Sequence, residues 1–182
     1  MCGTISAAAG QSFAPKVAVD KQGLGLAVWN DSAVITAVAL ASNGQWSAPV
    51  ELSSAELPCY GAPDLAMDTL GNGLAAWSDG QARVASYSPG VGWSQPSALS
   101  RPDEYASEPR VSVSPTGALR VVSWTDDNQN LARAATRASQ PRWSVNTLGT
   151  GLYDTPVEVS ANGTKARAFW SVRPVRMLML LR

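Results

Sequence analysis

Residues 63–77 read PDLAMDTLGNGLAAW, and this stretch contains the pattern on which the rest of the chain is built. A proline opens it and a short apolar run follows. Asp68 then precedes Gly71 by three positions, and a second apolar run ends in Trp77. A polar side chain at the first of these positions can bond the local backbone, and glycine can take the positive φ that a tight hairpin turn needs. The stretch therefore predicts a β-hairpin of two short strands.

The same pattern recurs four times at an interval of 46 to 48 residues. The opening proline stands at Pro15, Pro63, Pro109 and Pro156. The closing tryptophan stands at Trp29, Trp77, Trp124 and Trp170. A further tryptophan, each time followed by serine, stands at Trp46, Trp93 and Trp143. A repeat of this length with several short strands in each unit is typical of β-propeller blades.

Each unit is predicted to hold four strands, because two more apolar runs follow the hairpin. Third strands are expected at residues 33–40, 82–87, 131–136 and 175–181. Fourth strands are expected at residues 49–53, 96–100 and 145–148. The last unit stops after its third strand, while residues 3–6 align with residues 50–53 of a fourth strand.

We therefore expect an all-β chain that forms one β-propeller domain of four four-stranded blades. The blade repeats are residues 15–62, 63–108, 109–155 and 156–182, the last completed by residues 1–14. In this interpretation the terminal strands pair and close the ring, which leaves no exposed sheet edge.

The unit resembles the repeats of bacterial β-propeller proteins with sialidase-like or kelch-like blades. The resemblance rests on Pro-x-(apolar)-x-(apolar)-Asp-x-x-Gly…Trp and on Trp-Ser-x-Pro. It departs from the sialidase Asp-box, Ser-x-Asp-x-Gly-x-x-Trp, since Gly23 follows Asp20 by three residues and Trp29 follows Gly23 by six. The resemblance implies the fold, and it supplies no catalytic residue.

Composition excludes several classes of function. The chain has no histidine, which rules out Ser-His-Asp triads, Cys-His pairs and the common zinc sites. Its 14 basic and 14 acidic residues balance, so the positive surface of a nucleic-acid-binding protein is not expected. No apolar run approaches the roughly 20 residues that cross a membrane as a helix. We predict no catalytic residue, no cofactor and no metal.

Cys2 and Cys59 are too few for a disulfide scaffold. Two interpretations of Cys2 stay open, an acylated lipoprotein cysteine whose signal has been removed and a free thiol. The first would place the protein outside the cell or on its surface.

Candidate ligand-binding residues fall on the loops at one end of the expected blades. We call the four closing tryptophans the inner tryptophans. Aspartates follow three of them by two residues, at Asp31, Asp79 and Asp126. Aromatic residues lie shortly before each opening proline at Phe13, Tyr60, Tyr105 and Tyr153. An aromatic ring covers the apolar face of a sugar and a carboxylate accepts hydrogen bonds from its hydroxyls. The alternative is structural: the aspartates cap turns and the aromatic rings fill gaps between blades.

Three functions are compatible with this pattern. The first is a non-catalytic, lectin-like module that binds carbohydrate on the loop face. The second is a scaffold for a protein partner, or a half-propeller of which two copies form an eight-bladed homodimer. The third is a glycan hydrolase, which could use paired carboxylates without histidine. It ranks last because no acid–nucleophile pair stands out.

Overall fold

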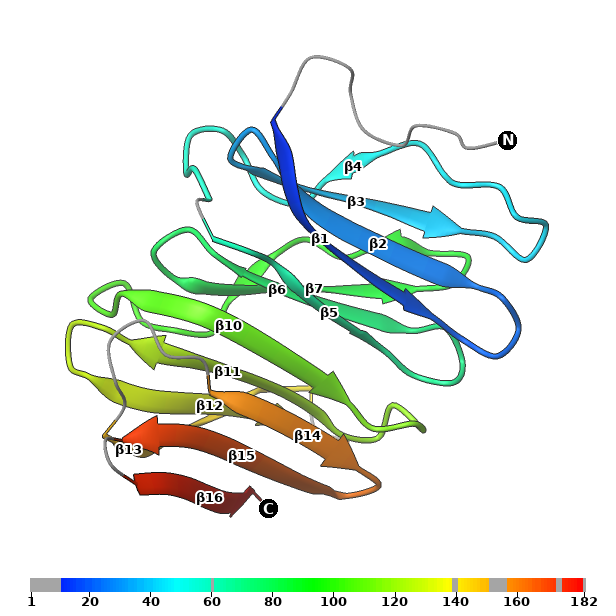
Figure 1. Ribbon diagram of the computed structural model, residues 1–182. Coiled ribbons are helices and arrows are strands. Elements are labelled where there is room, and N and C mark those ends of the chain that lie inside the picture. The colour runs from blue at the N-terminus through cyan, green and yellow to red at the C-terminus, as the bar shows by residue number, and fades with distance from the viewer. Residues whose placement is uncertain (1–10, 60, 139–140, 151–156, 173–174, 182) are drawn as a thin grey trace.

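The computed structural model describes residues 11–59, 61–138, 141–150, 157–172 and 175–181, and every regular element in these ranges is a strand. The strands form four separate antiparallel sheets, which we call blades 1 to 4 (Figure 1). Blade 1 consists of β1 (Ser12–Val19), β2 (Gly25–Asp31), β3 (Val34–Leu40) and β4 (Val50–Glu51). Blade 2 consists of β5 (Asp64–Met67), β6 (Gly73–Ser78), β7 (Ala82–Ser88), β8 (Gly92–Trp93) and β9 (Ser97–Ala98).

Blades 3 and 4 repeat the order, each strand pairing with the next along the chain. Blade 3 consists of β10 (Ala106–Val113), β11 (Arg120–Asp126), β12 (Leu131–Arg137) and β13 (Ser144–Thr150). Blade 4 consists of β14 (Glu158–Asn162), β15 (Lys165–Val172) and β16 (Val175–Leu181). The predicted four-unit, all-β organisation is confirmed at this level. No described helix is long and apolar enough to span a membrane.

The first strands of the blades lie beside one another: β1 contacts β5, β5 contacts β10, and β10 contacts β14. This is a propeller-like arrangement, in which the first strand of each blade is the innermost and the later strands follow outward. The described residues do not close into a ring, because blades 1 and 4 lie at opposite ends of the stack (Figure 1). The expected closure by a terminal strand involves residues 3–6, which lie outside the described residues.

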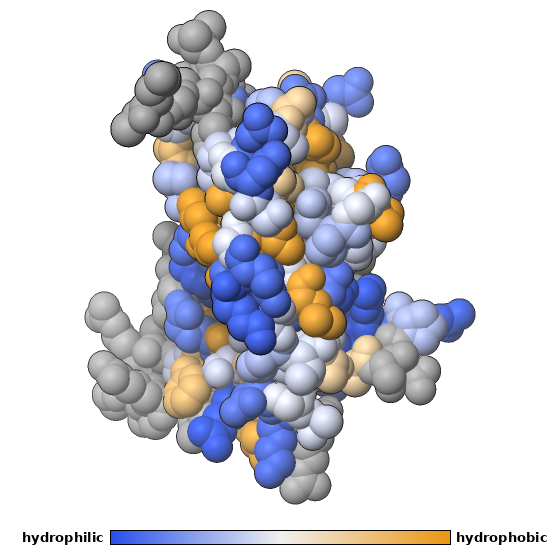
Figure 2. Space-filling view, turned by 90° about the vertical axis from the view of Figure 1, so that its right-hand side faces the viewer, coloured by the Kyte–Doolittle hydropathy of each residue, from blue (hydrophilic) through white to orange (hydrophobic). Residues whose placement is uncertain are grey.

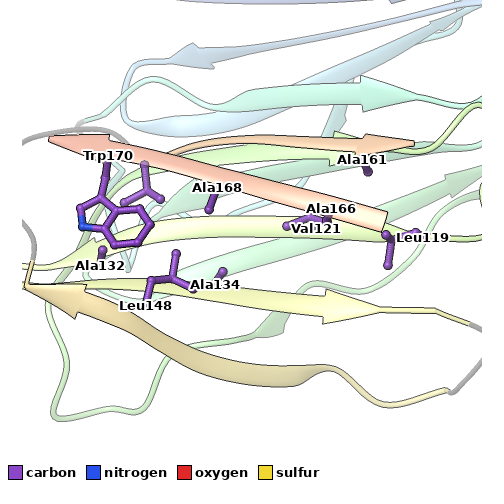
Figure 3. Packing of buried hydrophobic residues seen from close by; sticks show 10 residues of the cluster. Leu119, Val121, Ala132, Ala134, Leu148, Ala161, Ala166, Ala168 and Trp170 are labelled. Atoms are coloured by element: carbon purple, nitrogen blue, oxygen red, sulfur yellow. The ribbon is translucent and has the colours of Figure 1, made fainter. Parts of the chain in front are cut away.

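Trp77, Trp124 and Trp170 each pack against the preceding blade. Trp77 packs with Val28 and Ile35 of blade 1, and Trp124 packs with Leu74 of blade 2. Trp170 of β15 points toward Ala132 and Leu148 of blade 3 (Figure 3). Its indole N–H also donates to the carbonyl oxygen of Thr150 at 3.0 Å. Large aromatic side chains at these positions bury much apolar area, so they join consecutive sheets that share no backbone ladder.

The first strands of blades 1 and 3 begin upstream of their prolines, which corrects the expected boundary. In β1 the register shifts between Phe13 and Lys16, and Phe13 pairs with Asn30. In β10 the shift falls between Ser107 and Arg110. The residue before the proline has a positive φ in both, 52° at Ala14 and 47° at Glu108. A β-bulge of this kind bends the strand without ending it, so the proline lies inside the strand and does not open it.

The predicted tight turns join the first and second strands and gather on one side of the stack. The amide of Gly23 donates to the carbonyl of Asp20 at 3.2 Å, and Gly117 donates in the same way to Ser114 at 2.8 Å. Figure 2 faces this side and shows hydrophobic residues as small separate patches among hydrophilic ones. Consecutive turns also touch, since the hydroxyl of Thr69 donates to the carbonyl oxygen of Pro115 at 2.7 Å.

Replacement of a turn glycine should cost more where two blades meet at the turn. Gly117 has a φ of +70°, and a Cβ there would lie 2.3 Å from Oδ2 of Asp68 in blade 2. Gly23 has a φ of +82° in the same turn of blade 1, with open space around it. We expect Gly23→Ala to lower the free energy of unfolding by roughly 1 kcal/mol through backbone strain alone. Gly117→Ala should lose about 1–2 kcal/mol more through the clash. Urea unfolding measures both, and equal losses would contradict the turn-to-turn contact.

Candidate functional site

The three predicted aspartates lie at the same position of successive blades but in different surroundings. Asp31 ends β2, is half-buried, and accepts a hydrogen bond from the hydroxyl of Ser12 at 3.2 Å. Asp79 follows β6 and forms an ion pair with Arg83. Asp126 ends β11 and is fully buried. The structure therefore does not expose the three carboxylates on one common surface.

The pair of Asp79 and Arg83 faces blade 1. Arg83 lies directly opposite Trp77 in the β6–β7 register, so both side chains are on the face that meets the preceding blade. Its Nε lies 3.1 Å from Oδ1 and 3.0 Å from Oδ2 of Asp79, and its Nη2 donates to Oε1 of Gln81 at 3.0 Å. These contacts hold the guanidinium in one orientation at the loop end of the blade.

A cavity of about 340 Å³ lies beside this pair, between blades 1 and 2. We call it the blade 1–2 cavity. Blade 1 contributes one wall through Glu51, Leu52, Ser53, Ser54 and Leu57. Blade 2 contributes the other through Trp77, Asp79, Arg83, Gln95 and Pro96. The cavity therefore combines one tryptophan with a fixed guanidinium, carboxylates, hydroxyls and an amide.

Side-chain hydrogen bonds fix the wall that blade 1 supplies. The hydroxyl oxygen of Ser53 accepts from the amide of Ile35 at 2.8 Å. Asn30 is buried, and its Nδ2 donates to the carbonyl oxygens of Cys59 at 2.5 Å and Gly61 at 3.2 Å. Burial raises the pKa of the Cys59 thiol, which packs behind this wall. Ser53, Cys59 and Gly61 are thus each attached to the β2–β3 hairpin.

The equivalent place between blades 2 and 3, the blade 2–3 gap, is filled by the chain itself. Arg133 lies opposite Trp124 in the β11–β12 register, as Arg83 lies opposite Trp77. Its Nη2 lies 3.2 Å from Oδ2 of Asp126 and 3.3 Å from Oε1 of Glu104. Arg101 also approaches Glu104, with its Nε 3.1 Å from Oε1. Two arginines and two carboxylates therefore neutralise one another in this gap.

The predicted aromatic residues do not share one environment. Phe13 lies within β1, not in a loop, and is exposed. Tyr105 is exposed and lines a second cavity of about 140 Å³, together with Ser78, Gly80 and Glu108. Tyr60 and Tyr153 lie outside the described residues. The β6–β7 turn separates the two cavities, so Asp79 and Tyr105 are near each other in the fold but line different cavities.

Sequence reasoning missed the arginines and the blade 1 wall. Arg83, Arg133, Glu51 and Leu57 are not among the residues that the sequence predicted for a ligand site. The arginines could have been found from the strand register. A third-strand residue that pairs with the inner tryptophan has its side chain on the same face of the sheet, and so faces the same gap between blades. Among the described residues no group of three acidic or cysteine side chains could hold a metal ion.

Comparison with known proteins supports the fold. No family model and no curated protein matches the chain. AofleA from Arthrobotrys oligospora superimposes with a TM-score of 0.64 at 10% identity, over 92% of this chain and 53% of that one. A structure from a study of two prolyl endopeptidases gives a TM-score of 0.56 at 12% identity, over 94% and 28%. A bifunctional GH43-CE protein of Bacteroides eggerthii gives 0.50 at 10% identity, over 94% and 24%.

The chain thus spans about half the length of AofleA and about a quarter of the other two proteins. At these identities the likeness concerns the propeller-like fold and no particular residue.

The two aspartates at either extreme of burial should respond differently to neutralisation. Asp126→Asn removes one of two carboxylates that face the buried guanidinium of Arg133, so we expect a loss of about 2 kcal/mol in the free energy of unfolding. Asp31→Asn changes a half-exposed hydrogen bond and should stay within about 0.5 kcal/mol of the parent protein. Chemical denaturation of both variants checks this, and a near-neutral Asp126→Asn would argue against a structural ion pair.

Proposed function

We propose that the protein is a non-catalytic carbohydrate-binding module whose ligand occupies the blade 1–2 cavity. The observation that carries the proposal is the Asp79–Arg83 pair, in which Arg83 is 24% exposed and Asp79 nearly buried, beside a cavity otherwise lined by hydroxyl, amide and carboxylate groups. Its volume lies at the lower end of the range for small-molecule sites. This site replaces the broader loop face that the sequence suggested, and of the predicted residues it retains Asp79.

The chemistry of the cavity suits a sugar better than an apolar ligand. Sugar hydroxyls donate to carboxylates such as Glu51 and accept from a guanidinium, and such charge-assisted hydrogen bonds are the stronger kind. Leu57 and Pro96 supply apolar surface against the ring carbons. The fold is also shared with a GH43-CE protein, a carbohydrate-active enzyme, which supports a sugar-related role for this architecture.

Binding without hydrolysis is favoured by the state of Asp79. Both of its oxygens lie within hydrogen-bond distance of Nε of Arg83, so this carboxylate already has a cationic partner within its own blade. Hydrolysis would need a second, separately tuned carboxylate, for which Glu51 is the cavity's other acid. If the protein hydrolyses chromogenic glycosides and Glu51→Gln abolishes this activity, the protein is a glycan hydrolase instead.

Arg83→Gln should weaken glycan binding by roughly 10- to 100-fold, because one to two charge-assisted hydrogen bonds are lost. Arg137→Gln is the matched control, since Arg137 lies over the ring of Trp143 in blade 3, away from the cavity. A glycan array identifies a ligand and calorimetry measures both variants. Equal affinity of Arg83→Gln and the parent protein would place the site elsewhere.

A second candidate function is self-assembly of half-propellers, which the exposed ends of the stack favour. Val17 of β1 is 62% exposed, whereas its counterpart Val111 in blade 3 is 8% exposed beneath blade 2. At the other end Phe169 is 46% exposed, whereas its counterpart Val28 is buried against blade 2. Each end therefore presents positions that neighbouring blades cover elsewhere in the chain. A second copy fits both ends, and the pair would form an eight-bladed ring.

Light scattering tests the assembly: a mass near twice 19.1 kDa is expected at micromolar concentration. Val17→Asp combined with Phe169→Asp should give single chains, because a charge at each end opposes burial. Leu70→Asp is the control, since Leu70 is 67% exposed but lies on a tight turn. A parent protein with the mass of one chain would exclude the ring of two copies.

A further inference from the structure

Arg83 and Arg133 occupy the same place in successive blades, but only Arg133 has a second carboxylate. Each lies opposite its inner tryptophan, and each pairs with the aspartate two residues beyond that tryptophan. Arg133 in addition meets Glu104, which comes from the preceding blade's last loop. The two arginines thus differ in the number of carboxylates that they meet, two for Arg133 and one for Arg83.

Backbone hydrogen bonds show which residue of blade 1 corresponds to Glu104. Leu52 and Leu99 donate to equivalent carbonyls at the start of each third strand, Ile35 at 2.7 Å and Ala82 at 2.8 Å. Seven residues later, Cys59 donates to Ala33 at 2.8 Å and Ala106 donates to Gly80 at 2.9 Å. The intervening loops therefore have the same length and the same anchors. Five residues beyond Leu52 stands Leu57, and five beyond Leu99 stands Glu104.

The exchange of glutamate for leucine changes what the arginine can bind. The side chain of Glu104 is 4% exposed and its Oε1 lies within ion-pair distance of Arg133. Leu57 is 51% exposed and carries no acceptor. Among the described residues, Arg83 donates from Nε and Nη2 to Asp79 and Gln81, both of its own blade. The position that a carboxylate from blade 1 would occupy belongs to the open cavity.

Resting on the proposed function, we infer that the blade 1–2 cavity takes a carboxylate-bearing sugar, and that the blade 2–3 gap is a second copy of this site closed by Glu104. The ligand's carboxylate would meet Arg83 as that of Glu104 meets Arg133. Glu51 lies on exposed β4 and faces the same cavity, where it accepts from the sugar's hydroxyls. It also repels a carboxylate, so Arg83 has to supply the preference for an acid.

Calorimetry on the full chain tests the inference by comparing digalacturonic acid with galactobiose, a neutral reference disaccharide. We expect one digalacturonic acid per chain, bound at least tenfold more tightly than galactobiose. Leu57→Glu should abolish binding by placing a carboxylate on Arg83, while Leu57→Gln, of the same shape without charge, should retain most of it. Leu57 is exposed, so neither change threatens folding.

The complementary change opens the second site. Glu104→Leu should raise the stoichiometry of digalacturonic acid from one to two per chain, and Asp103→Leu, which removes a neighbouring exposed charge, should leave it at one. If Glu104→Leu fails to fold, the comparison of Leu57→Glu with Leu57→Gln decides alone. Unchanged binding in Leu57→Glu overturns the inference.

The outcomes separate this inference from the proposed function. Equal affinity for digalacturonic acid and galactobiose, both lost in Arg83→Gln, would keep the carbohydrate site and overturn its preference for acids. Binding of neither sugar, together with an array on which no glycan binds, would overturn both.

Discussion

The structure depends on the packing of one tryptophan in each of blades 2, 3 and 4 against the sheet before it. Sheets of three to five strands share no backbone ladder with their neighbours here, so side-chain packing joins one blade to the next, helped by single hydrogen bonds such as that from the amide of Ala106 to the carbonyl of Gly80. Trp77, Trp124 and Trp170 supply that contact at the same register position in each blade. Because the tryptophan fixes which face meets the preceding blade, it also fixes which residues of the third strand enter the gap. The position of Arg83 and Arg133 is a consequence of this packing.

Much of the fold could be predicted because its signals are local and repeated. The turns at Asp20–Gly23 and Ser114–Gly117 follow from side-chain capping and a positive φ, and the inner tryptophans from the period. The bulge at Ala14 was not predicted, since a proline that starts a strand and one that follows a bulge look alike in sequence. Closure of the ring by residues 3–6 stays a prediction, since those residues lie outside the described part of the chain.

The candidate site was harder to predict, because its residues come from two repeats. The rule that chose Asp79 for its place after Trp77 also chose Asp126, and both form an ion pair with an arginine of the next strand. The difference between the two pairs lies in residue Glu104 of the neighbouring repeat, and only the stacking of blades reveals it. Alignment of repeats one below another finds equivalent positions within a blade. A gap between blades combines the third strand of one repeat with the last loop of the repeat before.

The contacts between tight turns have a mechanical consequence for the cavities. Thr69 ties the turn of blade 2 to Pro115 of blade 3, and Gly71 lies close to Leu24 of blade 1, so the blades are in contact at that side of the stack. The blade 1–2 cavity and the cavity lined by Tyr105 lie at the loop side, around the β6–β7 turn. Adjacent blades are therefore held together along the row of tight turns, which acts as the hinge axis between them. Any change in the angle between two blades alters the width at the loops most, and a ligand that bridges both walls would fix that angle.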